Sequence, residues 1–275
     1  MSVFKIQTVI KMEVEFKFPK LDTQNAVEDI CSFIKSKLEE SKADGLVIGL
    51  SGGIDSSTVA YLCSRVLESD KILGLILPSE TTSSEDIEDA KTVAKNLGIK
   101  YKNLHIDPLI EPFPKLCPEC SDSALANGNL KARIRMMLLY YHSNSMNRLV
   151  MGTGNKTELF VGYFTKYGDG GVDILPIGDL YKTHVKEIAE YIGVPKNIIE
   201  KAPTAGLWTG QTDEDELGIT YDLLDKILYL MVDENLNIPD IAEHLKIEEN
   251  EVLRVKNMVE SSKHKLSSPS LIEID

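Results

Sequence analysis

A glycine- and serine-rich loop carries the clearest chemical signal in this sequence. It reads SGGIDSS at residues 51–57, follows the apolar run 46–50 and leads directly into a predicted helix. Adjacent glycines let a ligand approach the backbone, serines supply hydroxyl donors, and a helix start offers unpaired N–H groups at the positive end of its dipole. The loop therefore predicts an anion site, and the alternative is a plain glycine-rich turn with a capping Asp or Ser.

Two well-known phosphate motifs are excluded at this loop. It lacks the lysine of a GxxxxGK[ST] loop, and no GxGxxG dinucleotide fingerprint follows the strand. Asp55 would repel a phosphate held there, and a bridging Mg²⁺ is the simplest way to make this carboxylate useful.

Charged residues gather in three further blocks. Lys131 and Arg133 fall near the start of a predicted helix at 130–142, where the helix dipole disfavours cations. A ligand phosphate or carboxylate would explain them, and a solvated basic face is the alternative. The blocks GTGNKTE at 152–158 and GYFTKYGDGGVD at 162–173 mix charged side chains with glycines, a composition that favours loops in close contact with a ligand.

The elements that must position these blocks alternate between strands and helices. Such alternation predicts a doubly wound parallel sheet of the α/β class, with ligands outside the carboxyl ends of the strands, and a helical C-terminal part. We predict strands at 46–50, 72–77, 101–106 and 148–151, a short extended segment at 173–176, and helices at 57–68, 84–97, 130–142, 183–192, 221–232, 239–245 and 248–261.

Composition narrows the class of protein. The 275 residues include 30 Lys and Arg against 43 Asp and Glu, a net charge of −13, which argues against a nucleic-acid partner. No apolar run approaches a membrane span or a signal peptide, so we expect a cytoplasmic protein without a membrane partner. Four cysteines are too few for a disulfide scaffold.

Taken together, the motifs resemble those of the NAD⁺ synthetase family within the ATP-pyrophosphatase superfamily. SGGIDSS, GNLKARIRM, GTGNKTEL, GYFTKYGDGGVDILPI, LYKTHV, PTAGL, ELGITYDLLD and a terminal HK occur in that family's order, across residues 45–265. The resemblance implies an adenine nucleotide alpha hydrolase-like fold, a homodimer, and a ligase that converts nicotinate adenine dinucleotide (deamido-NAD⁺), ATP and ammonia to NAD⁺, AMP and pyrophosphate.

The resemblance also implies ligands for individual residues. It assigns Mg²⁺ to Asp55 and Glu158. It assigns the nicotinate dinucleotide to Arg133, Lys166, Asp173, His264 and Lys265. It assigns the co-substrate ATP to Gly49, Leu50, Ser51, Gly52, Gly53, Ile54, Asp55, Ser56, Thr153, Lys182 and Thr204.

The implied chemistry is electrostatic rather than covalent. Asp55 with its metal, together with Lys182, would offset charge while the nicotinate carboxylate attacks the α-phosphate of ATP. Asp169 is our candidate for the group that accepts a proton during attack by ammonia, Asp173 is the alternative, and either could simply cap a glycine turn.

Two other functions and two structural features stay open at this point. A tRNA-thiolating relative would need a basic surface and further cysteines, and a non-catalytic nucleotide-binding module would have no use for Asp55, Glu158 and Lys182 together.

The CxxC at Cys117 and Cys120 favours a structural loop over a zinc or redox site. We expect one domain over 1–275, with an N-terminal extension at 1–20, a mobile tail at 262–275, and free ammonia as the nitrogen source because a fused glutaminase would need a further domain.

Overall fold

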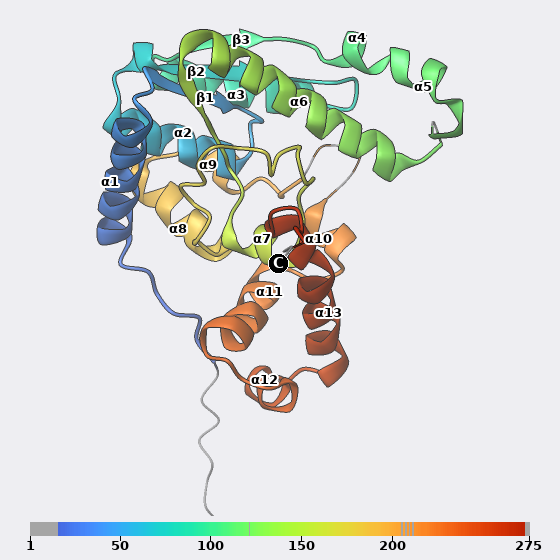
Figure 1. Ribbon diagram of the computed structural model, residues 1–275. Helices are drawn as coiled ribbons and strands as arrows, with labels where there is room; N and C mark the ends of the chain where they lie inside the picture. The colour runs from blue at the N-terminus through green and yellow to red at the C-terminus, as the bar shows by residue number, and fades with distance from the viewer. Residues whose placement is uncertain are drawn as a thin grey trace, which may run out of the picture.

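Four parallel strands form the centre of the protein in the order β3-β2-β1-β4 (Figure 1). A computed structural model describes residues 16–120, 122–204, 206, 208, 210 and 212–272. Gly49 of β1 pairs with Leu75 of β2, and Ile48 pairs with Met151 of β4, so these three strands end side by side. The strands are β1 (Gly45–Gly49), β2 (Ile72–Ile76), β3 (Lys100–Asn103) and β4 (Arg148–Met151).

Helices cover both faces of this sheet, as the doubly wound prediction requires. Ile48 belongs to a buried cluster that includes residues of α1, α2, α3 and α8, whereas its neighbour Val47 packs with Ile134 of α6 on the opposite face. The alternation follows from the period of two in a strand. These helices are α1 (Thr23–Ser41), α2 (Ile54–Val66), α3 (Ser84–Asn96), α6 (Ala124–Met146) and α8 (Lys182–Ile192).

Shorter helices connect the main layers. The arm between β3 and α6 holds three of them, and α7 follows β4 (Figure 1). They are η1 (Ser69–Lys71), α4 (Asp107–Ile110), α5 (Pro112–Leu116), η2 (Pro118–Cys120), α7 (Lys156–Val161) and α9 (Lys196–Ile199).

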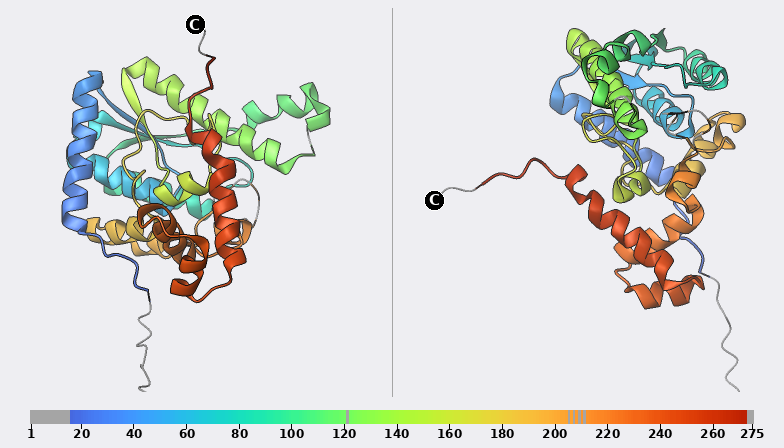
Figure 2. Two further views of the ribbon diagram at one scale, coloured as in Figure 1. Left: turned by 60° about the horizontal axis from the view of Figure 1, so that its bottom comes forward. Right: turned by 90° about the vertical axis from the view of Figure 1, so that its right-hand side faces the viewer.

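The C-terminal helices lie below the sheet domain in the right-hand view of Figure 2, and their apolar side chains form a second buried cluster. Leu224, Ile227, Ile241 and Val252 are buried there, and Phe18 from the N-terminal segment packs against it. The elements are α10 (Asp213–Leu217), α11 (Tyr221–Leu228), the π-helix η3 (Tyr229–Asp233), α12 (Ile238–Leu245) and α13 (Glu249–Leu266).

Several predicted boundaries were wrong. α1 was not predicted at all, although Val27, Ile30, Ile34 and Leu38 give it a buried helical face. At 173–176 only Ile174 bridges to the sheet, opposite Met151. α6 begins at Ala124, six residues before the predicted start, because Ser123 caps it by accepting from the Ala126 amide.

The predicted tail at 262–275 begins inside a helix. α13 runs to Leu266, five residues past the predicted end, and residues 273–275 lie outside the described residues. The predicted extension at 1–20 is described from Phe16 onward. Within the described part of the chain, no helix combines the length and apolar character needed to cross a membrane.

Candidate active site

The predicted anion loop joins the end of β1 to the start of α2. Gly52 has φ of +85°, and a Cβ there would lie 2.2 Å from the Asp86 carbonyl oxygen, so only glycine fits. The N-cap of α2 is Gly53, and no side chain caps it. The hydroxyls of Ser51 and Ser56 lie 3.0 Å apart beside this helix start. The loop therefore brings hydroxyl and amide donors together at the positive end of a helix.

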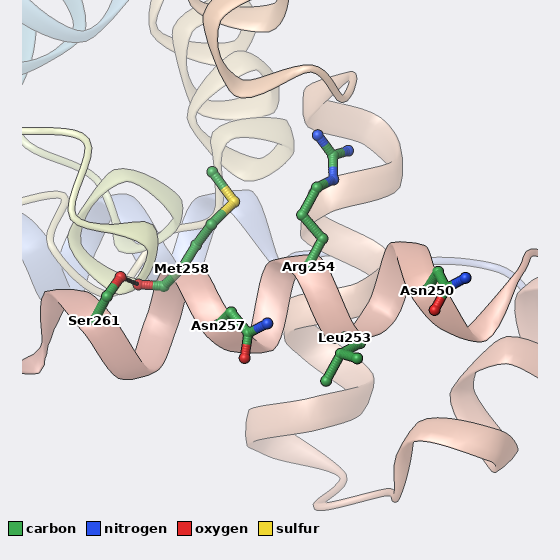
Figure 3. Close-up of a pocket in the computed structure, with 6 residues that line it drawn as sticks. All are labelled: Asn250, Leu253, Arg254, Asn257, Met258 and Ser261. Atoms are coloured by element: carbon green, nitrogen blue, oxygen red, sulfur yellow. Dashed lines mark hydrogen bonds between the residues drawn. The ribbon is translucent and has the colours of Figure 1, made fainter.

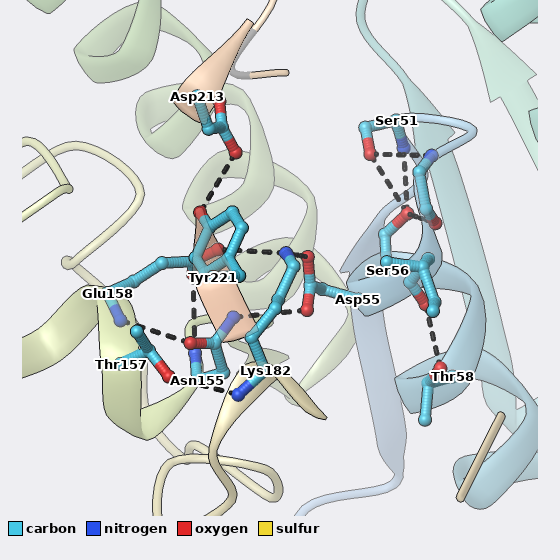
Figure 4. Close-up of polar contacts among 12 residues, drawn as sticks. Ser51, Asp55, Ser56, Thr58, Asn155, Thr157, Glu158, Lys182, Asp213 and Tyr221 are labelled. Carbon is cyan, nitrogen blue, oxygen red and sulfur yellow. Dashed lines mark hydrogen bonds and ion pairs between the residues drawn. The ribbon is translucent and has the colours of Figure 1, made fainter. Parts of the chain in front are cut away.

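Lys182 links two acidic side chains next to this loop (Figure 4). Its Nζ lies 2.5 Å from Asp55 Oδ2 and 3.2 Å from Glu158 Oε1. The three side chains are only 8%, 19% and 15% exposed for Lys182, Asp55 and Glu158 respectively. We predicted that the two carboxylates lie in loops, but each lies in the first turn of a helix, α2 and α7.

Asn155 orients both carboxylates. Its side-chain nitrogen donates to Asp55 Oδ1 at 3.1 Å, and its side-chain oxygen accepts from the Glu158 amide at 3.0 Å. The Asn155 amide donates in return to Glu158 Oε2 at 3.3 Å, which completes a capping box at the start of α7. We did not predict a role for Asn155, although Asn followed three residues later by Glu is a signal for such a cap.

Burial and neighbouring charges set the protonation of this cluster. Burial, with repulsion from Asp55 and Asp213, raises the pKa of Glu158 to about 8, and Lys182 opposes this rise. The carboxylates of Asp55 and Glu158 raise the pKa of Lys182 against its own desolvation. Lys182 therefore holds its charge firmly, and Glu158 holds a proton more tightly than an ordinary glutamic acid, because burial disfavours its ionised form.

Two further polar residues close the cluster on the side of the C-terminal helices. The Tyr221 ring lies under Lys182, with Nζ 5.0 Å from its centroid, and its hydroxyl donates to Asp213 Oδ2 at 3.1 Å. Asp213 is buried, and its Oδ1 has no hydrogen-bond partner among the residues that the structure describes. Burial raises the pKa of Asp213, and Lys182 opposes this rise. Neither residue was predicted, because both lie in a segment of ordinary helical composition.

The other two threonines assigned to ATP, Thr153 and Thr204, make no hydrogen bond to Asp55, Glu158 or Lys182 in the described part of the chain. Thr153 is half-buried after β4, at the same sheet edge as the anion loop. Thr204 is exposed, and its hydroxyl accepts from the Gly206 amide. The adjacent Pro203 carbonyl accepts from the Asp213 amide.

Most candidates for the nicotinate dinucleotide gather at a second place, around the loop 162–167. Lys265 Nζ donates to the Gly162 and Phe164 carbonyls at 2.7 and 2.9 Å. Lys166 Nζ donates to the carbonyl of His264 at 2.5 Å, and Arg133 Nη2 donates to the carbonyl of Lys166 at 3.3 Å. Burial lowers the pKa of Lys265. The structure thus brings the side chains of Arg133, Lys166 and Lys265, and the backbone carbonyl of His264, to this one loop.

Lys131 and Arg133 do not lie near a helix start as we predicted. They fall in the third turn of α6, because that helix begins at Ala124. Lys131 is buried, and its Nζ donates to Thr81 Oγ1 at 3.2 Å. The dipole argument used for these two cations was therefore wrong.

The two candidate proton acceptors both hold backbone amides. Asp169 Oδ1 accepts from the Thr165 amide at 2.9 Å, and desolvation by the surrounding protein raises the pKa of its carboxyl. Asp173 accepts from Tyr140 OH at 2.9 Å and from the Val150 amide at 2.7 Å, which fixes it beside β4. A raised pKa favours a carboxyl that accepts a proton, which supports Asp169 as the candidate.

A pocket and a pair of thiols in the described part of the chain lie outside these two places. A shallow pocket of about 480 Å³ lies along α13 and contains none of the predicted site residues (Figure 3). Cys117 and Cys120 are exposed free thiols in the arm before α6. Among the residues that the structure describes, no three His, Cys, Asp or Glu side chains form a group that could hold a metal by themselves.

Comparisons with known proteins agree on one family. The family model described as NAD synthase matches residues 26–269. The NH(3)-dependent NAD(+) synthetase of Archaeoglobus fulgidus is 51% identical over 255 residues, which make up 92% of this chain and 98% of that protein. The NMN synthetase of Francisella tularensis has a TM-score of 0.81 at 36% identity, over 93% of this chain and 100% of that chain. The NH3-dependent NAD synthetase of Campylobacter jejuni, solved with a nitrate ion, has a TM-score of 0.78 at 32% identity, over 92% and 100%.

Proposed function

The chain belongs to the NAD synthase family, and we propose that it is an ammonia-dependent NAD⁺ synthetase that works in two steps. In the first step a carboxylate oxygen of nicotinate adenine dinucleotide attacks the α-phosphorus of ATP. The bond to the bridging oxygen breaks, and pyrophosphate leaves. In the second step ammonia attacks the activated carbonyl carbon, the bond from that carbon to AMP breaks, and the nitrogen loses a proton.

One observation carries this proposal: the buried contacts of Lys182 with Asp55 and Glu158 beside the uncapped start of α2. The loop at 51–57 has donors for a phosphate but no lysine, and Lys182 supplies the missing cation from another element. Pyrophosphate departure builds negative charge, which a preorganised ammonium and helix amides stabilise without moving. A module that only binds a nucleotide would have no use for this buried triad.

The two carboxylates also fit a magnesium ion. Asp55 and Glu158 each contact the same Nζ atom, so their oxygens lie within reach of one cation. Mg²⁺ prefers oxygen ligands and takes the rest of its shell from substrate phosphates and water, which agrees with only two protein carboxylates. When bound, the ion would neutralise charge on the phosphate oxygens, and it would hold Glu158 in its ionised form.

The second step takes place on the nicotinate carboxyl. We assign the dinucleotide to Arg133, Lys166, His264 and Lys265 around the loop 162–167, with Asp173 fixed beside β4. Asp169 lies in the same glycine-rich loop and has a raised pKa, so it is our candidate for the proton acceptor. A homodimer, a cytoplasmic location and the use of free ammonia stay predictions.

Product analysis tests the proposal. The protein is incubated with ATP, Mg²⁺, ammonium and nicotinate adenine dinucleotide, and NAD⁺, AMP and pyrophosphate are quantified by chromatography. We expect the three products in equal amounts. A second reaction contains nicotinate mononucleotide as the acceptor, because the Francisella tularensis neighbour is an NMN synthetase. Faster turnover of the mononucleotide would change the assigned substrate, and no AMP from either acceptor would refute the proposal.

A pair of variants connects the activity to the site. Asp55 is the second residue of α2, and Glu85 is the second residue of α3 and exposed, so Glu85→Ala is a matched control for a first-turn acid. Asp55→Ala should abolish AMP release while Glu85→Ala retains it, with both variants folded by circular dichroism. Turnover retained by Asp55→Ala would remove this residue from the site.

A further inference from the structure

Two residues of helix α11 contact the segments that carry Lys182 and Glu158. Tyr221 and Asp225 are four residues apart, so they lie on one face of the helix. We propose that this face of α11 positions Lys182 and Glu158 for the reaction, with Tyr221 acting on the side chain of Lys182 and Asp225 acting on the backbone that carries it. The inference rests on the proposed function, because it concerns how that same site is held.

Asp225 binds the first turns of two helices at once. Its Oδ1 accepts from Thr157 Oγ1 at 2.6 Å in α7, and its Oδ2 accepts from the Thr183 amide at 2.8 Å and the Thr183 hydroxyl at 2.7 Å in α8. Asp225 is fully buried. A buried carboxylate is costly unless hydrogen-bonded, and here three donors compensate it.

Thr157 links Asp225 to the backbone of Lys182 by hydrogen bonds. Its Oγ1 donates to Asp225 and accepts from the Lys182 amide at 2.9 Å. Thr157 immediately precedes Glu158 in the first turn of α7, and Lys182 is the first residue of α8. One hydroxyl therefore sets the distance between the two helix starts whose side chains meet at Nζ.

Tyr221 completes the contact from the same face. The Lys182 ammonium lies over the face of its ring, and the negative potential of that face attracts a cation. Its own orientation is fixed from α10, because its hydroxyl donates to Asp213 Oδ2 and its amide donates to Glu214 Oε1 at 2.7 Å. Thr157 thus holds the Lys182 backbone, and the ring of Tyr221 lies against its ammonium group.

A matched pair at Thr157 tests the proposal. Thr157→Ser keeps the hydroxyl and loses a methyl group, whereas Thr157→Val keeps the shape and loses the hydroxyl. Steady-state kinetics are measured for the holoenzyme with saturating Mg²⁺. If the hydroxyl positions the site, Thr157→Val lowers kcat about tenfold to a hundredfold while the serine variant stays within about threefold of wild type. The KM for the nicotinate dinucleotide should stay unchanged in both variants.

A purely structural role predicts the opposite order. Packing alone would favour valine over serine, so a serine variant less active than the valine variant, or equal activity of both, overturns the proposal.

Asp225→Asn is the second variant, with Asp222→Asn on the exposed side of α11 as its control. We expect reduced kcat only in Asp225→Asn, and wild-type kcat in that folded variant also overturns the proposal. A wild-type protein that makes no AMP would instead refute the proposed function.

Discussion

Proton release tests the electrostatics of the site in a way that activity does not. The pKa of Glu158 is raised to about 8 by burial and by the nearby Asp55 and Asp213. A carboxyl whose pKa is raised this far keeps its proton more often near pH 7 than an ordinary glutamic acid and loses it at more alkaline pH. A carboxylate that binds a divalent cation must be ionised. Binding of magnesium–ATP should therefore release a proton near pH 7 and release fewer protons at pH 9.

Calorimetry measures this release. Premixed magnesium–ATP is titrated into the protein in two buffers of very different ionisation enthalpy, and the difference in heat gives the number of protons. Premixing removes the protons that ATP itself releases to the metal. Glu158→Gln is the control, because the amide cannot ionise and should release no proton at either pH. Equal release by wild type and Glu158→Gln, or release that does not fall between pH 7 and pH 9, would refute the assignment.

Three more substitutions test the remaining parts of the site. Gly52→Ala should destabilise the protein by about 1–3 kcal/mol and weaken ATP binding, because the position has a positive φ and its Cβ would meet the Asp86 carbonyl oxygen; thermal unfolding and ATP titration measure both. Lys265→Met should raise the KM for the nicotinate dinucleotide about tenfold or more and leave the KM for ATP unchanged, and a change confined to ATP would contradict its assignment. Asp169→Asn should lower kcat/KM for ammonia without slowing exchange of labelled pyrophosphate into ATP, and a loss of that exchange would move Asp169 to the first step.

The sequence predicted the sheet, and the place of the glycine-rich loop at 51–57 between a strand and a helix, because local patterns encode both. Buried strands of apolar residues separated by amphipathic helices specify a parallel sheet, and the strand order then places the loops after β1 and β4 at one edge. Resemblance to a family supplied Lys182 and Glu158, which are 24 residues apart and meet only in the folded protein. No spacing rule could have paired them.

The missed features depend on tertiary contacts. Tyr221 and Asp225 both lie within the motif ELGITYDLLD. In a helix, an aromatic residue normally indicates a face packed in the core, and an acidic residue normally indicates a face exposed to solvent. Asp225 is buried instead, because three donors from α7 and α8 meet it. The wrong start of α6 has a local cause, since the weak helix formers Asn127, Gly128 and Asn129 interrupt the helical pattern after the Ser123 cap.

The central claim is that the nicotinate carboxylate is activated as an adenylate, and isotope transfer tests it most directly. Nicotinate adenine dinucleotide labelled with ¹⁸O in both carboxylate oxygens is converted with ATP, Mg²⁺ and ammonium, and the AMP is analysed by mass spectrometry. Attack by that carboxylate on the α-phosphorus predicts one ¹⁸O atom in each AMP and none in pyrophosphate. Unlabelled AMP, or label in pyrophosphate, would contradict the account.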